Sequence, residues 1–241
     1  MWLNDGTGTF QEMVEHALPH TSKFTMAVDF ADIDRDGDDD FLLIDMLAKT
    51  HRRRVQQMGM MDQLSEASNK LEGRPQVKRN TLFLNRGDRT FAEIGQLSGI
   101  EATDWTWSVR FLDVDLDGFE DILATNGQVH DFEDTDTNYR VQRLTAFGYD
   151  YRRMTSLYPD YLTPNVAFRN NGDLTFADSS AQWGFAEADM SWGLAFADFD
   201  NDGDLDLATN RHDRPAGIFR NNVAASRVAV RLHGRAPNTQ G

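Results

Sequence analysis

Aspartates in three segments of the chain have the spacing expected of ligands to a hard cation. Residues 32–40, 113–121 and 198–206 all fit the pattern D-x-D-x-D-G-x-x-D, and we name them Asp loops 1, 2 and 3. In such a loop the carboxylates at positions 1, 3 and 5 point to one side, and glycine at position 6 permits a sharp reversal. The carbonyl at position 7 then turns inward, and the carboxylate at position 9 closes the shell.

This donor set predicts a calcium site in each loop, about three in all. Ca²⁺ takes six to eight oxygen ligands in a flexible arrangement, whereas Mg²⁺ demands a rigid octahedron. The predicted metal ligands are Asp32, Asp34, Asp36, Asp38, Asp40, Asp113, Asp115, Asp117, Phe119, Asp121, Asp198, Asp200, Asp202, Asp204 and Asp206, with Phe119 contributing only its carbonyl.

Two other interpretations of the loops are weaker. An EF-hand begins in the same way but needs glutamate at position 12 and flanking helices. Position 12 is Leu43, Ala124 or Thr209 here. Solvated Asp/Gly turns are the second alternative. Three loops at matched positions disfavour it, because the gathered carboxylates repel one another unless a cation is present or their pKa values rise.

A second landmark, a turn with a trailing phenylalanine, shows that the loops belong to a repeat. It reads NDGTGTF from Asn4, NRGDRTF from Asn85 and NNGDLTF from Asn170, and each turn asparagine precedes the next Asp loop by 28 residues. If Asn221 marks the last turn, the basic unit has 51 residues. The first two units then carry insertions of 30 and 34 residues, at about 47–79 and 128–163.

Short apolar runs flank each landmark and predict four strands in each unit. Runs of this kind precede each Asp loop (26–28, 107–109, 192–194), follow it (41–43, 122–124, 207–208) and precede each turn (2–3, 82–84, 167–168). Four antiparallel strands in about 50 residues are typical of a β-propeller blade. The aligned residues Ala27, Ser108 and Gly193 are always small, which indicates an innermost strand crowded near the propeller axis.

The two insertions are predicted to be helical. Apolar residues fall on one helical face in each of them. These residues are Val55, Met58, Met61, Leu64, Ser68 and Leu71 in the first insertion, and Val141, Leu144, Phe147, Tyr151, Met154 and Tyr158 in the second. Pro159 and Pro164 are expected to end the second helix. Such helices either cap the propeller or present a surface to a partner.

Composition excludes several classes of protein. The content of 40% hydrophobic and 11% aromatic residues indicates a globular chain rather than a disordered one. A net charge of −15 argues against nucleic acid as a partner. Without cysteine, no disulfide or thiolate metal site is possible, and no apolar run approaches the roughly 18 residues of a membrane helix. No signal peptide precedes Met1, but this carries little weight because the pattern suggests that the chain begins within a repeat.

The D-x-D-x-D-G-x-x-D loop between two strands, with the N-x-G-x-x-T-F turn, resembles the FG-GAP/VCBS repeat of integrin-like β-propellers over residues 1–222. Residues 226–241 resemble the start of the ASPIC/UnbV module, which follows such repeats in the cartilage acidic protein family. The resemblance implies an all-β fold of propeller blades with calcium-binding loops and two helical insertions. This chain would hold part of a propeller, which in the family is commonly seven-bladed.

The function expected from this resemblance is adhesion or protein interaction by a non-catalytic, calcium-binding propeller, placed extracellularly, in the periplasm or on the outer cell surface. The alternative is a calcium-stabilised enzyme that acts on polysaccharide, for which Asp45, Asp104, Asp131 and Glu133 are candidate acid–base residues. In an up-and-down blade the insertions lie at the end of the sheet opposite the Asp loops. We therefore expect a protein or glycan ligand on the insertion face, near its basic residues Arg52, Arg53, Arg152 and Arg153.

Overall fold

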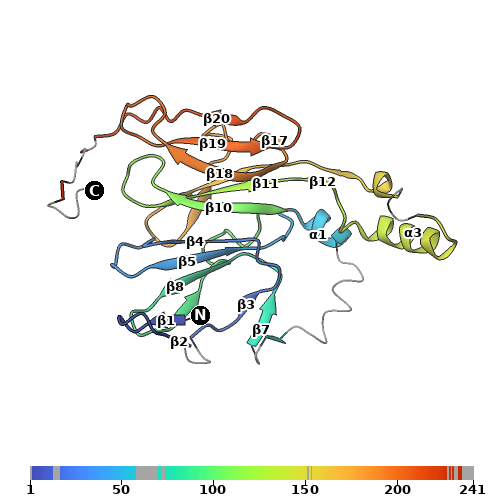
Figure 1. The fold of residues 1–241 in the computed structure, drawn as a ribbon, viewed down its shortest axis with the longest axis horizontal. Coiled ribbons are helices and arrows are strands. Elements are labelled where there is room, and N and C mark those ends of the chain that lie inside the picture. The colour runs from blue at the N-terminus through green and yellow to red at the C-terminus, as the bar shows by residue number, and fades with distance from the viewer. Residues whose placement is uncertain are drawn as a thin grey trace.

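Three antiparallel sheets, the blades, stack in a row and form the body of the fold, and smaller sheets surround them, as a computed structural model shows (Figure 1). The structure describes residues 2–12, 17–57, 70–71, 74–150, 152, 154–226, 228, 230 and 233–234. The first blade has the strand order β4-β5-β8-β9, the second β10-β11-β15-β16 and the third β18-β19-β20. The all-β fold with four-stranded blades is thus confirmed for the first two units. The sheets do not close into a ring within the described part of the chain.

The strands of the blades have the following bounds. The first blade is built from β4 (Ala27–Ala31), β5 (Asp40–Ile44), β8 (Thr81–Asn85) and β9 (Phe91–Glu93). The second uses β10 (Thr106–Leu112), β11 (Asp121–Asn126), β15 (Val166–Asn170) and β16 (Phe176–Asp178). The third uses β18 (Ser191–Ala197), β19 (Asp206–Arg211) and β20 (Gly217–Phe219). A separate hairpin of β1 (Trp2–Asn4) and β2 (Phe10–Glu12) surrounds the first turn.

The register of the strands repeats from blade to blade. Phe30 pairs with Phe41 and Phe41 with Phe83 in the first blade. The matched rows are Phe111, Ile122 and Phe168 in the second blade, and Phe196, Leu207 and Phe219 in the third. Because a shift of one residue would turn every side chain to the other face, this shared register places the matched residues on the same face of each sheet. In the second and third blades that face meets the preceding blade, whereas in the first blade Phe41 and Phe83 pack with Leu18 and Phe91.

Two apolar clusters hold the sheets together. The cluster between the first and second blades includes Leu42, Leu82, Val109, Ile122 and Val166, each no more than 1% exposed. The cluster between the second and third blades contains Leu123, Ala167, Phe185 and Leu207, with Phe196 and Phe219 packed against it. The first strands of the blades, β4, β10 and β18, lie next to one another, as expected for the innermost strands.

The insertions lie at the end of the blades opposite the Asp loops, as predicted (Figure 1). They contain α1 (His51–Gln57), α3 (Thr135–Ala146) and a 3-10 helix, η3 (Thr155–Leu157). They also contain short strands: β6 (Lys70–Leu71), β7 (Arg74–Val77), β12 (Gln128–His130), β13 (Asp160–Tyr161) and β14 (Thr163–Pro164). β7 pairs with β3 (Thr21–Ser22), β12 with β13, and β14 with β17 (Ala188–Asp189).

The prediction of wholly helical insertions was therefore wrong in part. Leu71 lies in a strand, and Met58, Met61, Leu64 and Ser68 lie outside the described residues. The second helix ends at Ala146, well before Pro159, because Gly148 follows with a positive φ of 85° and reverses the chain. Tyr151 lies outside the described residues, whereas Met154 and Tyr158 fold back and pack with Val141. No helix in the described residues is long and apolar enough to cross a membrane.

Most of the tail that resembles the ASPIC/UnbV module, residues 226–241, lies outside the described residues. That assignment stays a prediction.

Candidate metal centres

The three Asp loops share one backbone conformation. Their glycines at position 6, Gly37, Gly118 and Gly203, all have a φ of 93°, a value that glycine adopts readily because it has no Cβ. The residues at position 4 are also left-handed, although they are Arg35, Leu116 and Asn201, with φ of 64°, 56° and 60°. Two reversals in nine residues curl each loop around its own carboxylates. The glycine reversal was predicted, but the one at position 4 has no residue-type signal.

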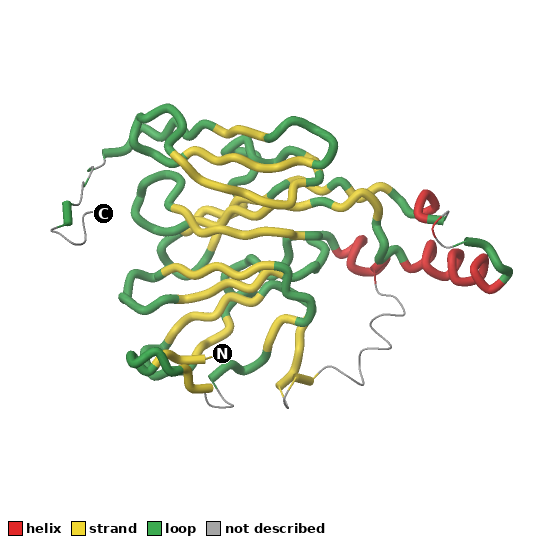
Figure 2. Tube along the Cα trace, viewed as in Figure 1, coloured by secondary structure: helices red, strands yellow, loops and turns green. Residues whose placement is uncertain are grey.

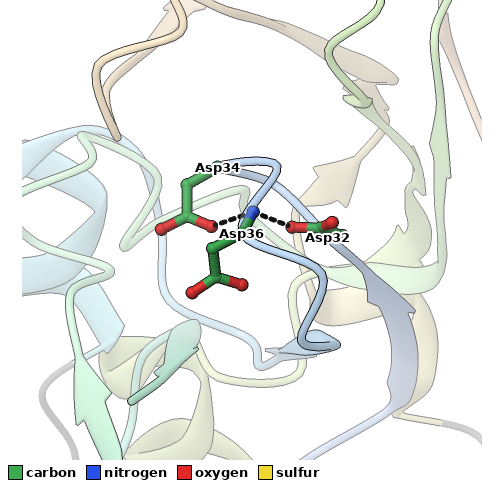
Figure 3. Close-up of side chains that lie close together, drawn as sticks. All are labelled: Asp32, Asp34 and Asp36. Atoms are coloured by element: carbon green, nitrogen blue, oxygen red, sulfur yellow. Dashed lines mark hydrogen bonds between the residues drawn. The ribbon is translucent and has the colours of Figure 1, made fainter. Parts of the chain in front are cut away.

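Backbone amides fix the carboxylates at positions 1 and 3. In Asp loop 1 the Asp36 N–H donates to Asp32 Oδ1 at 3.0 Å and to Asp34 Oδ1 at 3.3 Å (Figure 3). The Gly37 N–H donates to Asp32 Oδ2 at 2.9 Å. The corresponding three distances are 3.0, 3.3 and 2.8 Å in Asp loop 2 and 3.1, 3.3 and 3.0 Å in Asp loop 3. The loops are therefore preformed to the same pattern.

The aspartate at position 9 ties each loop to the third strand of its own blade. Asp121, which is 0% exposed, accepts from the Val114 N–H at 2.9 Å and from the Asn170 N–H at 2.8 Å. Asp40 makes the same two contacts with Ile33 and Asn85, at 3.0 and 2.7 Å. Asp206 makes them with Phe199 and Asn221, both at 2.8 Å. The third contact identifies Asn221 as the last turn asparagine, as the 51-residue unit predicted.

Burial makes these carboxylates costly to ionise without a nearby cation. It raises the pKa of Asp40 to about 6 and that of Asp121 to about 7, although two backbone N–H groups oppose the shift in each case. Burial, with the neighbouring Asp36 carboxylate, also raises the pKa of Asp34. Burial likewise raises the pKa of Asp113, with the carboxylates of Asp117 and Asp115 adding to the shift. A cation within the loop would favour the ionised forms.

Three carboxylates of each loop bring oxygen atoms within 4.8 Å of one another. These sets are Asp32, Asp34 and Asp36 in Asp loop 1, Asp113, Asp115 and Asp121 in Asp loop 2, and Asp198, Asp200 and Asp206 in Asp loop 3. Converging carboxylates with no nitrogen or sulfur donor fit a hard cation such as Ca²⁺, so the residues fit the expected ion. The carboxylates at positions 1 and 3 thus lie close together in every loop. The third carboxylate of the group is that of position 5 in Asp loop 1 and that of position 9 in Asp loops 2 and 3.

The residues at position 7 share a backbone contact, but their side chains lie in different surroundings. The backbone N–H groups of Asp38, Phe119 and Asp204 donate to the position 5 carboxylate at 2.9, 2.9 and 3.2 Å. The Asp38 side chain is exposed and that of Asp204 is buried. The Phe119 ring packs under Arg35, whose guanidinium carbon lies 4.3 Å from the ring centroid. Arg35 Nε also donates to the Gly118 carbonyl at 2.6 Å, so Asp loop 1 contacts Asp loop 2 directly.

Two arginines next to the loops were missed by the sequence reasoning. Arg169 and Arg220 each stand directly before a turn asparagine, and each forms salt bridges with positions 3 and 5 of the Asp loop in its own blade. The matched residue in the first blade is Leu84. The position was visible in the repeat alignment, but nothing in the sequence showed that the side chain turns toward the loop.

The turn asparagines also connect neighbouring blades. Asn170 Nδ2 donates to the Ile33 carbonyl of Asp loop 1 at 3.1 Å, and Asn221 Nδ2 donates to the Val114 carbonyl of Asp loop 2 at 2.8 Å. Ile33 and Val114 occupy the same loop position, so this bond from one blade to the preceding loop is itself repeated.

Comparison with known families agrees with this repeat. A family model described as FG-GAP-like repeat matches residues 1–43, 71–124 and 156–209. Each matched segment contains one turn and the Asp loop that follows it, and the segments leave out much of both insertions. No curated protein matches the chain.

Proposed function

The chain belongs to the FG-GAP-like repeat family, and from this premise we propose that it is a calcium-binding, non-catalytic module of the integrin-like β-propeller type that serves adhesion or interaction with a protein or glycan. The observation that carries the proposal is the conserved geometry of the loops within this one chain. Three segments that share the D-x-D-x-D-G-x-x-D pattern but differ at its other positions adopt the same backbone, the same amide-to-carboxylate hydrogen bonds and a similar convergence of oxygens. Such repetition is not expected of solvated turns.

Calcium would act mainly as a structural ion. The aspartates of each loop join the first two strands of a blade, and position 9 also reaches the third strand. A bound cation would therefore cross-link strands that the unfolded chain separates, and it would offset the repulsion among the carboxylates.

The opposite end of the blades is proposed as the partner-binding surface. Figure 2 shows the helices gathered at that end, away from the Asp loops. Elaborated loops on a rigid scaffold commonly carry binding residues. Arg52 and Arg152 are exposed there, whereas Arg153 lies outside the described residues.

Arg53 was expected on the partner-binding insertion face, but its side chain is only partly exposed and contacts neighbouring segments. Its guanidinium carbon lies 4.7 Å from the centroid of the Tyr161 ring, and Nη1 lies 3.6 Å from Asp104 Oδ1. It therefore fastens α1 to β13 of the second insertion and to the segment that precedes β10, and its replacement should affect stability as well as any partner.

A location outside the cytosol follows from the proposed ion. Calcium sites of extracellular modules typically have dissociation constants of about 10⁻⁴–10⁻³ M, and the resting cytosol would leave such sites empty. Fractionation of cells that express the natural protein tests this, and recovery from the cytosol alone would contradict it.

The candidate acid–base residues of the alternative enzyme function hold loops in place. Asp45, which is 0% exposed, accepts from Ser22 Oγ at 2.6 Å and from the backbone N–H groups of Lys23 and Phe24. Glu133 lies 2.6 Å from Lys78 Nζ. These contacts support structural roles, and a polysaccharide depolymerisation assay is the direct test of the alternative.

The metal proposal is tested by calorimetric titration with calcium and by thermal melts in calcium and in chelator. At a free calcium concentration of about 100 times the Kd of an independent site, binding to that site should add about 2.7 kcal/mol to the free energy of unfolding. Asp34→Asn should reduce the calcium-dependent rise in Tm. Asp213→Asn is the matched control, because it removes one carboxylate that is 90% exposed and outside the loops. Equal melting temperatures in calcium and chelator would contradict the proposal.

A further inference from the structure

The three Asp loops share one backbone conformation, but they differ in whether an arginine is paired with their carboxylates. We infer that Arg169 and Arg220 are built-in cations that compete with a bound divalent ion in Asp loops 2 and 3, so that Asp loop 1, which has Leu84 at the matched position, is the tightest calcium site of the chain. The inference rests on the proposed calcium binding and assigns an order to the three sites.

In Asp loop 2 the guanidinium of Arg169 bridges two predicted ligands. Arg169 Nε lies 2.5 Å from Asp115 Oδ2, and Nη2 contacts Asp117 Oδ2. An arginine guanidinium is charged at any ordinary pH, so this counter-ion is always present. A planar guanidinium with two parallel N–H donors is the side chain best suited to hold two carboxylate oxygens. A divalent ion that uses Asp115 and Asp117 must first displace these contacts.

In Asp loop 3 the same contact is looser. Arg220 Nε lies 2.5 Å from Asp200 Oδ2, but Nη2 is 3.7 Å from Asp202 Oδ2. The Arg220 side chain is 61% exposed, compared with 38% for Arg169. Water screens an exposed ion pair more strongly, so Arg220 should be the weaker competitor.

In the part of the chain that the structure describes, no arginine is paired with the carboxylates of Asp loop 1. Leu84 packs instead against the apolar cluster between the first and second blades. Within the described residues Asp32, Asp34 and Asp36 form no salt bridge. Arg35 belongs to this loop but turns away from its carboxylates toward Gly118 and Phe119 of the neighbouring loop.

The loops differ in which carboxylate completes the converging group, and the difference follows the presence of the arginine. Positions 1, 3 and 5 converge in Asp loop 1, where no arginine holds them. Positions 1, 3 and 9 converge in the other two loops, where position 5 faces the arginine. The expected order of calcium affinity is therefore Asp loop 1, then Asp loop 3, then Asp loop 2.

The test is calorimetric titration of the whole chain with calcium chloride, comparing the natural sequence with Arg169→Leu and Arg220→Leu. Leucine is the residue that the first blade carries at this position. Arg169→Leu should tighten one weak site about tenfold or more, as expected for removal of a bidentate charge pair, and Arg220→Leu should tighten the other weak site by a smaller factor, because its contact is looser. Arg140→Leu is the control, because it changes the net charge equally on an exposed position of α3 at the far end. Asp34→Asn should remove the tightest site.

Thermal melts provide an independent readout of the same exchange. In chelator, Arg169→Leu should melt below the natural sequence, because Asp loop 2 has lost its internal counter-ion. In saturating calcium the difference should disappear. Should Arg169→Leu fail to fold, the more exposed Arg220→Leu carries the test.

The possible outcomes separate the two proposals. If the natural sequence binds calcium and neither arginine variant binds it more tightly than the Arg140→Leu control, the inference is overturned and the proposed calcium binding stands. Loss of a weak site rather than the tightest one in Asp34→Asn overturns the order of the sites. If neither the natural sequence nor the variants bind calcium, the proposed function itself fails.

Discussion

Replacing the turn asparagine of the second blade measures how strongly one blade is bound to the preceding Asp loop. Asn170 is 1% exposed, and its side chain makes three hydrogen bonds. Nδ2 donates to the carbonyls of Ile33 and Glu120 at 3.1 and 3.2 Å, and Oδ1 accepts from the Gly172 N–H at 2.9 Å. Asn170→Ala removes all three and leaves buried backbone groups without these partners.

The matched residue of the first blade provides the control. Asn85 makes two comparable bonds, donating to the Asp39 carbonyl at 3.2 Å and accepting from the Gly87 N–H at 3.1 Å. Neither bond leaves its own blade. At about 1 kcal/mol for each bond, Asn170→Ala should cost about 3 kcal/mol and Asn85→Ala about 2 kcal/mol. The greater burial of Asn170 should widen the difference, because an unsatisfied buried group costs more than an exposed one.

Urea denaturation of both variants and the natural sequence in chelator gives these free energies directly. The m value should not change, because the surface exposed on unfolding is the same. Asn221→Ala repeats the test, since Asn221 donates to Val114 at 2.8 Å across the next pair of blades. If Asn85→Ala cost as much as Asn170→Ala, the bond between blades would contribute nothing, and the reasoning would be refuted.

Three further substitutions test local features. Gly37→Ala should cost about 1 kcal/mol for its positive φ alone, since a Cβ there meets no atom within 4 Å. Gly118→Ala should cost more, because its Cβ would lie 1.5 Å from Arg35 Nη2 and would push that side chain off the Gly118 carbonyl and the Phe119 ring; urea melts of both variants measure the difference. Phe83→Ala should cost about 3–5 kcal/mol, because Phe83 is 0% exposed, and a cost below about 1 kcal/mol would contradict its core role. Lys49→Met should cost less than about 1 kcal/mol at pH 7, because the pair with Asp178, at 2.6 Å, is partly exposed. Burial raises the pKa of Asp178, but hydrogen bonds from Lys49 and Ser180 outweigh it and leave that pKa lowered. The pair's stabilisation is therefore present above the ordinary aspartate pKa and is lost as the pH falls through the lowered one, so the difference between Lys49→Met and the natural sequence should shrink steadily as melts are taken to pH values below that ordinary pKa.

The repeated spacing of the turns and Asp loops, together with the apolar runs beside them, was enough to predict the blades. The constant distance from turn asparagine to Asp loop, with the short apolar runs beside each landmark, placed the strand pairs. These features are local and repeated, so each copy supports the assignment of the others. Asn221 shows the strength of the repeat, because the spacing identified it without the trailing phenylalanine and the bond to Asp206 confirms it.

Contacts that join distant segments could not be predicted in this way. Arg169 lies 54 residues from Asp115, and nothing in the residue type indicates whether an arginine turns toward a loop or toward water. The strand pairing of β3 with β7 joins two segments of only two and four residues, too short to show periodicity. In the second insertion the apolar face continues past Ala146 because the chain folds back on Val141, and a pattern of apolar residues does not distinguish this from a longer helix.

The contacts around the Asp loops form a continuous connection along the stack. Asp121 accepts a hydrogen bond from the backbone N–H of Asn170, and the side chain of the same asparagine donates one to the Ile33 carbonyl of the preceding loop. The Ile33 N–H in turn donates to Asp40, the position 9 aspartate of that loop. Because Asp loops 1 and 2 are each connected through one asparagine to the next blade, whatever orders one of these loops, a bound ion or an arginine, also restricts its neighbour. The loop end is therefore best understood as one structural unit that spans the three sheets.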